Sequence, residues 1–83
     1  MKTRRTTKFN LMLGHKVFMA REKAGFTQNT LARAMDCDRT TIGLIERGQS
    51  GITLQNAALL AYVCGTTLGE LFKELGDVEA WRE

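Results

Sequence analysis

Two short helical stretches on either side of residues 36–38 are the feature that most limits how this chain can fold. Residues 28–35 and 39–47 place apolar side chains at helical spacing: Leu31, Ala32 and Met35 in the first, Ile42 and Ile45 in the second. Helices of about eight or nine residues are too short to be stable alone in water. The rest of the chain must therefore cover their apolar sides.

Residues 36–38, Asp-Cys-Asp, interrupt the helical pattern between these stretches. Aspartate tolerates the left-handed backbone that a tight turn needs, so Asp36 fits this position. Asp38 is a favourable N-cap for the helix that follows. The segment therefore predicts a helix-turn-helix, in which two helices are joined by a turn of about three residues.

Three further stretches at helical spacing surround this unit. The first runs from residue 9 to Gly25, its predicted C-cap, and places five apolar side chains on one face: Phe9, Leu13, Val17, Ala20 and Ala24. Thr27 can cap the next helix, and Thr53 starts a fourth helix that runs to Cys64. Thr67 and Glu70 have the spacing of a capping box and begin a fifth helix, which Gly76 ends.

The predicted fold class is therefore all-α, with five helices in one domain over residues 9–76 and a short tail over residues 77–83. Residues 1–50 hold ten Lys or Arg and four Asp or Glu, whereas residues 51–83 hold two and five. Such an uneven distribution suits a polyanionic partner for the first half. Residues 1–8 are predicted to be a flexible basic arm that can wrap a duplex or enter a minor groove, with charges at Lys2, Arg4, Arg5 and Lys8.

Membrane, metal and enzyme classes are disfavoured by what the sequence lacks. No apolar run approaches the roughly 20 residues that span a bilayer, and no signal-peptide stretch follows the N-terminus, so we expect a cytoplasmic protein. Cys37 and Cys64 form no Cys-x-x-Cys motif and His15 is the only histidine, so we expect no metal and interpret both cysteines as small buried side chains. The residues of this chain supply no plausible catalytic set of nucleophile, base and orienting group, so we expect no enzyme activity. We also expect no cofactor and no small-molecule ligand.

The chain from Leu13-Gly14 to Phe72 resembles the helix-turn-helix domain of lambda-type repressors, Cro proteins and xenobiotic-response-element regulators. The matching pieces are Arg21-Glu22-x-x-Gly25-x-Thr27-Gln28, Leu31-Ala32, Thr41-Ile42-x-x-Ile45-Glu46-Arg47-Gly48 and Leu68-x-Glu70-Leu71-Phe72. Together they span about 60 of the 83 residues at the family's spacing. The resemblance implies a lambda-repressor-like fold and a transcriptional regulator that places residues 39–47 in the major groove of double-stranded DNA.

Within that family, Asp38-Arg39-Thr40 is most similar to the controller proteins of restriction–modification systems. Those proteins usually continue with an aromatic residue where Thr41 stands here. Thr30 stands where an acidic residue is common, so the capping box of the second helix is expected to be lost. The open alternatives are a phage repressor, an antitoxin that also binds a toxin, and a protein-interaction module that has kept the fold.

The resemblance also implies roles for individual residues. Arg39 is expected to read a guanine edge, Thr40 to meet a base edge or stay exposed, and Leu44 to meet a thymine methyl or pack on the fourth helix. Contacts to the DNA backbone are expected from Gln28, Thr41, Arg47, Gln49 and Ser50. Glu46 is implied to pair with Arg21 and to brace the first helix against the third.

A homodimer is expected because one recognition helix covers too few base pairs to specify a genomic site. Its operator would be an inverted repeat that mirrors the two-fold axis of the protein. The fifth helix carries more apolar side chains than a small core needs, and these are expected to form the interface: Leu68, Leu71, Phe72 and Leu75. Trp81 fits either this interface or a frayed terminus.

Overall fold

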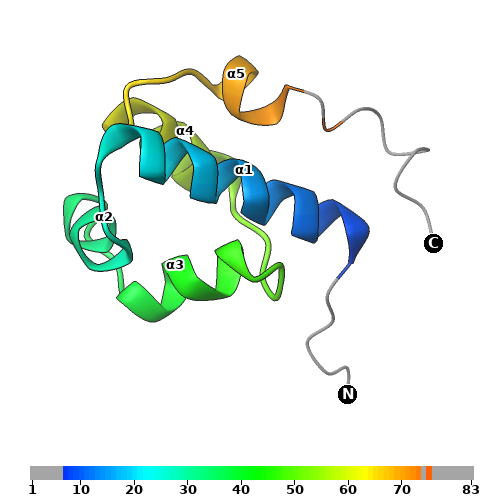
Figure 1. Cartoon of the computed structure of the whole chain (residues 1–83), viewed down its shortest axis with the longest axis horizontal. Coiled ribbons are helices and arrows are strands. Elements are labelled where there is room, and N and C mark those ends of the chain that lie inside the picture. Colours follow the sequence, from blue (N-terminus) through cyan, green and yellow to red (C-terminus); the bar gives the residue numbers. More distant parts are fainter. Residues whose placement is uncertain (1–6, 74, 76–83) are drawn as a thin grey trace.

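A computed structural model describes residues 7–73 and 75, and this part of the chain forms five α-helices and no strand (Figure 1). The helices are α1 (Lys8–Ala24), α2 (Gln28–Ala34), α3 (Arg39–Glu46), α4 (Leu54–Val63) and α5 (Leu68–Phe72). The predicted all-α class is confirmed. None of these helices is long and apolar enough to cross a lipid bilayer.

The predicted arm and tail fall mostly outside the described residues. This holds for Lys2, Arg4, Arg5 and residues 76–83, which include Gly76 and Trp81. Lys8 is described and is the first residue of α1, so it belongs to the helix rather than to the arm.

Threonine hydroxyls begin four of the helices in the described part. Thr7, Thr27, Thr53 and Thr67 each accept a hydrogen bond from the backbone N–H three residues later. Each bond satisfies one of the backbone N–H groups that a helix start leaves without a partner. These caps explain why the short helices begin where they do.

The start of α2 contains the capping box that the sequence was expected to lack. Thr27 Oγ1 accepts the N–H of Thr30 at 3.0 Å, and Thr30 Oγ1 accepts the N–H of Thr27 at 2.8 Å. The arrangement needs only an acceptor oxygen on the third residue of the helix, and a hydroxyl supplies one as a carboxylate does. The expectation of a lost capping box is therefore wrong.

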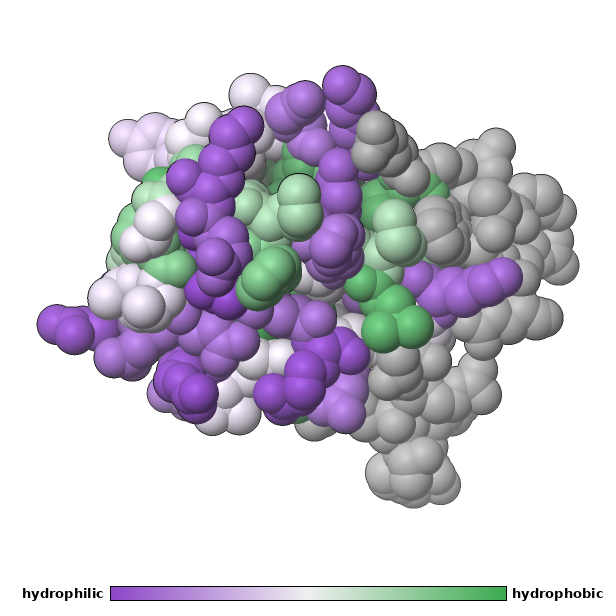
Figure 2. Space-filling model, in the orientation of Figure 1, coloured by the Kyte–Doolittle hydropathy of each residue, from purple (hydrophilic) through white to green (hydrophobic). Residues whose placement is uncertain are grey.

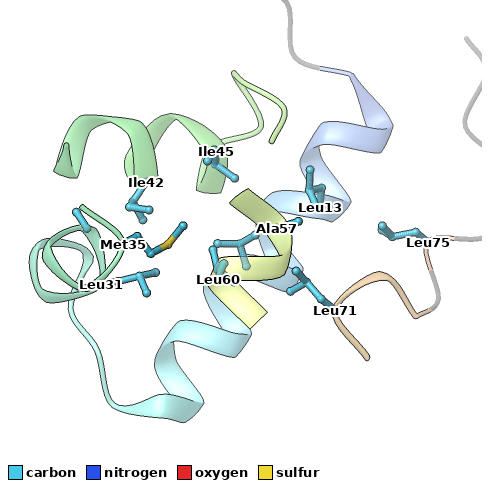
Figure 3. Packing of buried hydrophobic residues seen from close by; sticks show 11 residues of the cluster. Leu13, Leu31, Met35, Ile42, Ile45, Ala57, Leu60, Leu71 and Leu75 are labelled. Atoms are coloured by element: carbon cyan, nitrogen blue, oxygen red, sulfur yellow. The ribbon is translucent and has the colours of Figure 1, made fainter. Parts of the chain in front are cut away.

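α1 runs through the middle of the molecule, with α3 on one side and α5 on the other (Figure 1). The apolar faces of the helices meet between them in a single core (Figure 3). Its members are Leu13, Val17, Leu31, Ala32, Met35, Ile42, Ile45, Ala57, Leu60, Leu71 and Leu75. Phe9 and Ala24, predicted to face inward, are exposed instead, because α1 extends at both ends beyond the part that Leu13 and Val17 anchor.

The end of the chain corrects two of the four residues in the predicted dimer interface. α5 ends at Phe72, because Lys73 adopts an extended backbone with ψ of 139° rather than continuing the helix. Leu71 and Leu75 are each only 3% exposed and belong to the core of their own chain. Leu68 and Phe72 are half-buried and pack against that core. Leu71 and Leu75 are therefore not free to form an interface, since exposing them would open the core.

Gly14 sets how closely α1 approaches α3. A methyl group at this position would overlap the backbone carbonyl oxygen of Ile45 and would lie 2.7 Å from that of Glu46. Backbone atoms cannot swing aside as the end of a long side chain can. The glycine therefore allows the two helices to pack at backbone contact and fixes the position of α3.

We predict that Gly14→Ala destabilises the protein by about 2 kcal/mol or more, as overpacking a filled site does. The matched control is Gly51→Ala, where the new methyl would meet nothing closer than the Asn10 side chain at 3.8 Å. That variant should stay within about 0.5 kcal/mol of the parent. Urea unfolding followed by circular dichroism measures both, and equal stability of the two variants would contradict the close approach at Gly14.

Candidate nucleic-acid interface

The turn between α2 and α3 is built around one left-handed residue. Asp36 has φ of 57°, which is the conformation that the sequence predicts. The N–H of Cys37, the residue after Asp36, donates to the carbonyl oxygen of Ala32 at 2.9 Å, so this bond closes over the left-handed residue at the end of the helix. The turn thus ends α2 and lets α3 pack back across it.

Two side chains in this turn differ from their predicted roles. Cys37 is exposed rather than buried. Partial desolvation, followed by the charges of Asp38 and Asp36, raises the pKa of the Cys37 thiol. Asp38 does occupy the N-cap position of α3, but its side chain makes no capping hydrogen bond. Cys64, the other predicted buried cysteine, is half-buried against the core.

The first turn of α3 faces solvent. Arg39, Thr40 and Thr41 are all exposed, whereas Ile42 and Ile45 on the opposite side are buried. Hydrophilic residues also dominate the edge of the molecule where α3 lies (Figure 2). Leu44 is half-buried, so part of its side chain can be reached from outside. This face carries polar groups that can donate or accept hydrogen bonds outside the protein.

A buried ion pair holds the other end of α3. Arg21 Nε donates to Glu46 Oε2 at 2.6 Å, and Arg21 Nη2 donates to Glu46 Oε1 at 3.1 Å. Their side chains are only 8% and 6% exposed, and the hydrogen bond to Glu46 raises the pKa of Arg21. Arg21 also donates to the carbonyl oxygen of Phe26 at 2.9 Å and lies 5.3 Å from the ring centre of Phe18. The structure thus contains the pair that the resemblance implies, linking α1 to α3.

Glu46 has a further partner that sequence reasoning missed. The side-chain amide of Gln28, the first residue of α2, donates to Glu46 Oε1 at 2.9 Å. The carboxylate therefore joins α1, α2 and α3 at one point. No spacing rule signals this bond, because its two residues lie 18 positions apart and on different helices.

Gly43 brings two expected DNA-contacting residues together on α3. A methyl group here would lie 3.2 Å from Arg47 Nη1 and 3.7 Å from Gln28 Oε1, so both side chains cover this side of the helix. Arg47 Nε donates to Gln49 Oε1 at 3.4 Å. A glycine inside a helix is unfavourable by about 1 kcal/mol relative to alanine. A glycine within the predicted third helix was therefore the sequence signal that could have indicated a close contact at Gly43.

The expected DNA-contacting residues therefore form two groups. Arg39, Thr40 and Thr41 lie at the start of α3, and Gln28, Arg47 and Gln49 gather near its end. Ser50 is half-buried in the following loop, where its hydroxyl donates to the carbonyl oxygen of Gly51 at 3.1 Å. α3 is long enough, at about 12 Å for eight residues, to keep the groups apart.

Comparison with known proteins identifies the same region. The family model HTH_3, helix-turn-helix, matches residues 18–71. Control protein C.MunI from a Mycoplasma species is 33% identical over 57 residues, which cover 69% of this chain and 77% of that protein.

Solved structures of restriction-modification controller proteins are also similar. C.AhdI from Aeromonas hydrophila is 33% identical with a TM-score of 0.72, and the match covers 76% of this chain and 96% of that one. Wild-type C.Esp1396I is 25% identical with a TM-score of 0.73, and the match covers 83% of this chain and 90% of that one.

We predict that Arg21→Met and Glu46→Gln each lower the free energy of unfolding by about 3 kcal/mol, because each leaves a buried polar partner uncompensated. The double variant should lose less than the sum of the two single losses, because the two residues are in direct contact. Chemical denaturation of the three variants measures this coupling.

Lys73 and Glu70 provide the matched control. Their ion pair spans 3.6 Å and both side chains are more than half exposed. Exposed pairs contribute little, so Glu70→Gln should change stability by at most about 0.5 kcal/mol. Stability losses at Arg21 and Glu46 no larger than this would contradict the bracing role of the buried pair.

Proposed function

The chain belongs to the HTH_3 helix-turn-helix family and is a DNA-binding transcriptional regulator, and from this premise we propose that it controls a restriction–modification system by binding an inverted-repeat operator through α3. The names of its similar proteins, a control protein and a restriction-modification controller, support this assignment. Asp38-Arg39-Thr40 at the start of α3 supports it from the sequence side.

The observation that carries the proposal is the exposed first turn of α3. Three polar side chains project there from a helix whose opposite side is anchored in the core by Ile42 and Ile45. A rigid helix of this kind fits the major groove of B-DNA, which is about 12 Å wide. These side chains then meet base edges from a backbone that is already fixed, so little backbone freedom is lost on binding.

In this proposal, one group of residues contacts the DNA bases and another group contacts the DNA backbone. Arg39 hydrogen-bonds a guanine edge, with Thr40 and Leu44 completing the base contacts. The DNA backbone is held by Thr41 in the first turn of α3, by Lys8 at the start of α1, by the arm residues Lys2, Arg4 and Arg5, and by side chains nearer the end of α3: Gln28, Arg47, Gln49 and Ser50.

We predict that Arg39→Ala weakens binding to the operator by about 1–3 kcal/mol and relaxes the preference for one symmetric base pair. Arg47→Ala should instead weaken operator and random DNA by similar factors and reduce the salt dependence by about one unit, because phosphate is the same on every sequence. The measurement is the affinity of each variant for an operator selected from a random pool, for its guanine-substituted form and for random duplex, at several salt concentrations.

The two arginines serve as controls for one another, since each variant loses one positive charge. Equal weakening of all three duplexes by Arg39→Ala would show that Arg39 does not read a base. Reading through α3 would then have to depend on Thr40, Leu44 or DNA shape.

α4 offers a surface for the proposed homodimer. The helix carries no charged residue, and only Ala57, Leu60 and Ala61 of it are buried. Eight of its ten residues are apolar, and so apolar a helix is usually covered on most sides, yet Leu54 is 69% exposed and Tyr62 is 82% exposed. We therefore assign the two-fold interface to this exposed face in place of the buried leucines near α5. The half-site centres would lie about 34 Å apart, one turn of DNA.

We predict that Tyr62→Asp shifts the protein from dimer to monomer, because pairing two copies would bury two uncompensated carboxylates. Sedimentation velocity at micromolar concentrations measures the change. Met19→Asp on α1, at a side chain that is 55% exposed, is the matched control and should remain dimeric. A dimeric Tyr62→Asp would contradict the α4 interface, and a monomeric parent protein, with and without DNA, would contradict the dimer.

A further inference from the structure

We infer that Glu46 is a positioning residue for DNA binding, because it holds the Gln28 amide in one orientation before DNA arrives. This inference rests on the proposed backbone contact of Gln28. It gives Glu46 a second task besides its ion pair with Arg21, since the same carboxylate accepts hydrogen bonds from both side chains.

The bonds to the carboxylate show how it can perform both tasks. Oε2 accepts Arg21 Nε, while Oε1 accepts both Arg21 Nη2 at 3.1 Å and Gln28 Nε2 at 2.9 Å. The Glu46 side chain is only 6% exposed, so water competes little for these bonds. Arg21 also neutralises the charge, and a carboxylate so close to the DNA would otherwise repel phosphate.

An ionised carboxylate can only accept hydrogen bonds, so it distinguishes the two ends of an amide. Gln28 must turn its nitrogen toward Glu46, and its carbonyl oxygen then lies on the side of Gly43 and Arg47. The amide nitrogen has two N–H groups, and Glu46 takes one. The second makes no hydrogen bond within residues 7–73 and 75. That N–H is a donor, which a phosphate oxygen requires.

Holding the amide in advance improves binding for an entropic reason. A free glutamine side chain loses rotamer freedom when it meets a ligand, and this loss offsets part of the hydrogen bond that it gains. A glutamine already fixed by a shielded bond loses little more. The contribution of Gln28 to DNA affinity should therefore depend on Glu46.

A double-mutant cycle tests this dependence. Gln28→Ala, Glu46→Gln and the double variant are titrated with a selected operator and with a random duplex, at a temperature where circular dichroism shows every variant folded. A glutamine at position 46 replaces one of the two carboxylate oxygens with an NH2 group. When its oxygen meets Arg21 Nε, the NH2 faces Gln28, which can then turn its carbonyl oxygen inward, so the orientation of the Gln28 amide is no longer fixed.

In the parent background, Gln28→Ala should weaken binding to both duplexes about fivefold, the usual scale of one net hydrogen bond. In the Glu46→Gln background the same change should cost less than about twofold. Met19→Ala, at an exposed position on α1 outside the proposed DNA and dimer surfaces, is the control and should cost nothing in either background. Equal losses from Gln28→Ala in both backgrounds, or no loss in the parent, overturn the inference.

A measurement on the parent protein covers the case in which Glu46→Gln does not fold. In the absence of DNA, the side-chain ¹⁵N order parameter of Gln28 should exceed about 0.7, near the value of rigid backbone, and that of Asn29, which is exposed on α2, should fall below about 0.6. A Gln28 amide as mobile as that of Asn29 overturns the inference. The proposed base reading is tested separately, because Arg39→Ala alters neither the Gln28–Glu46 bond nor this order parameter.

Discussion

The Glu46 carboxylate is a buried negative charge at the point where α1, α2 and α3 meet. The arrangement of these helices depends on a positive charge that neutralises it. Arg21 supplies the opposite charge in a two-point hydrogen-bonded pair. Gly14 lies seven residues, or about two turns, before Arg21, so both face α3 from the same side of α1. Backbone contact at Gly14 and the ion pair at Arg21 together fix the end of α3.

This anchoring is uneven along α3. The end of the helix is held by Gly14 and Arg21, whereas its start lacks even a side-chain cap from Asp38. The polar side chains of the first turn thus project from a helix that is fixed elsewhere. Recognition benefits from such a division, because rigidity comes from the anchored end while the first turn stays open to a ligand.

The sequence predicts local features of this fold well, because they are encoded by neighbouring residues. A capping threonine comes directly before each of α2, α4 and α5 and accepts the backbone N–H three residues later. Asp36 marks the left-handed turn. The Arg21–Glu46 pair came from the family resemblance rather than from spacing.

The errors arose where tertiary contacts decide. The sequence indicated that Leu71 and Leu75 are surplus to the core, but both are buried in it. Leu71 packs there from within α5, and Leu75 lies beyond Lys73, where the chain has left the helix. Neither the Gln28–Glu46 bond nor the exposure of Cys37 has a local signal. The environment of Cys37 affects the chemistry of the turn: desolvation and the charges of Asp38 and Asp36 raise the pKa of its thiol, and oxidants attack the thiolate. The turn between α2 and α3 therefore carries a cysteine that is exposed to solvent yet holds less of its reactive thiolate form than an unperturbed thiol would.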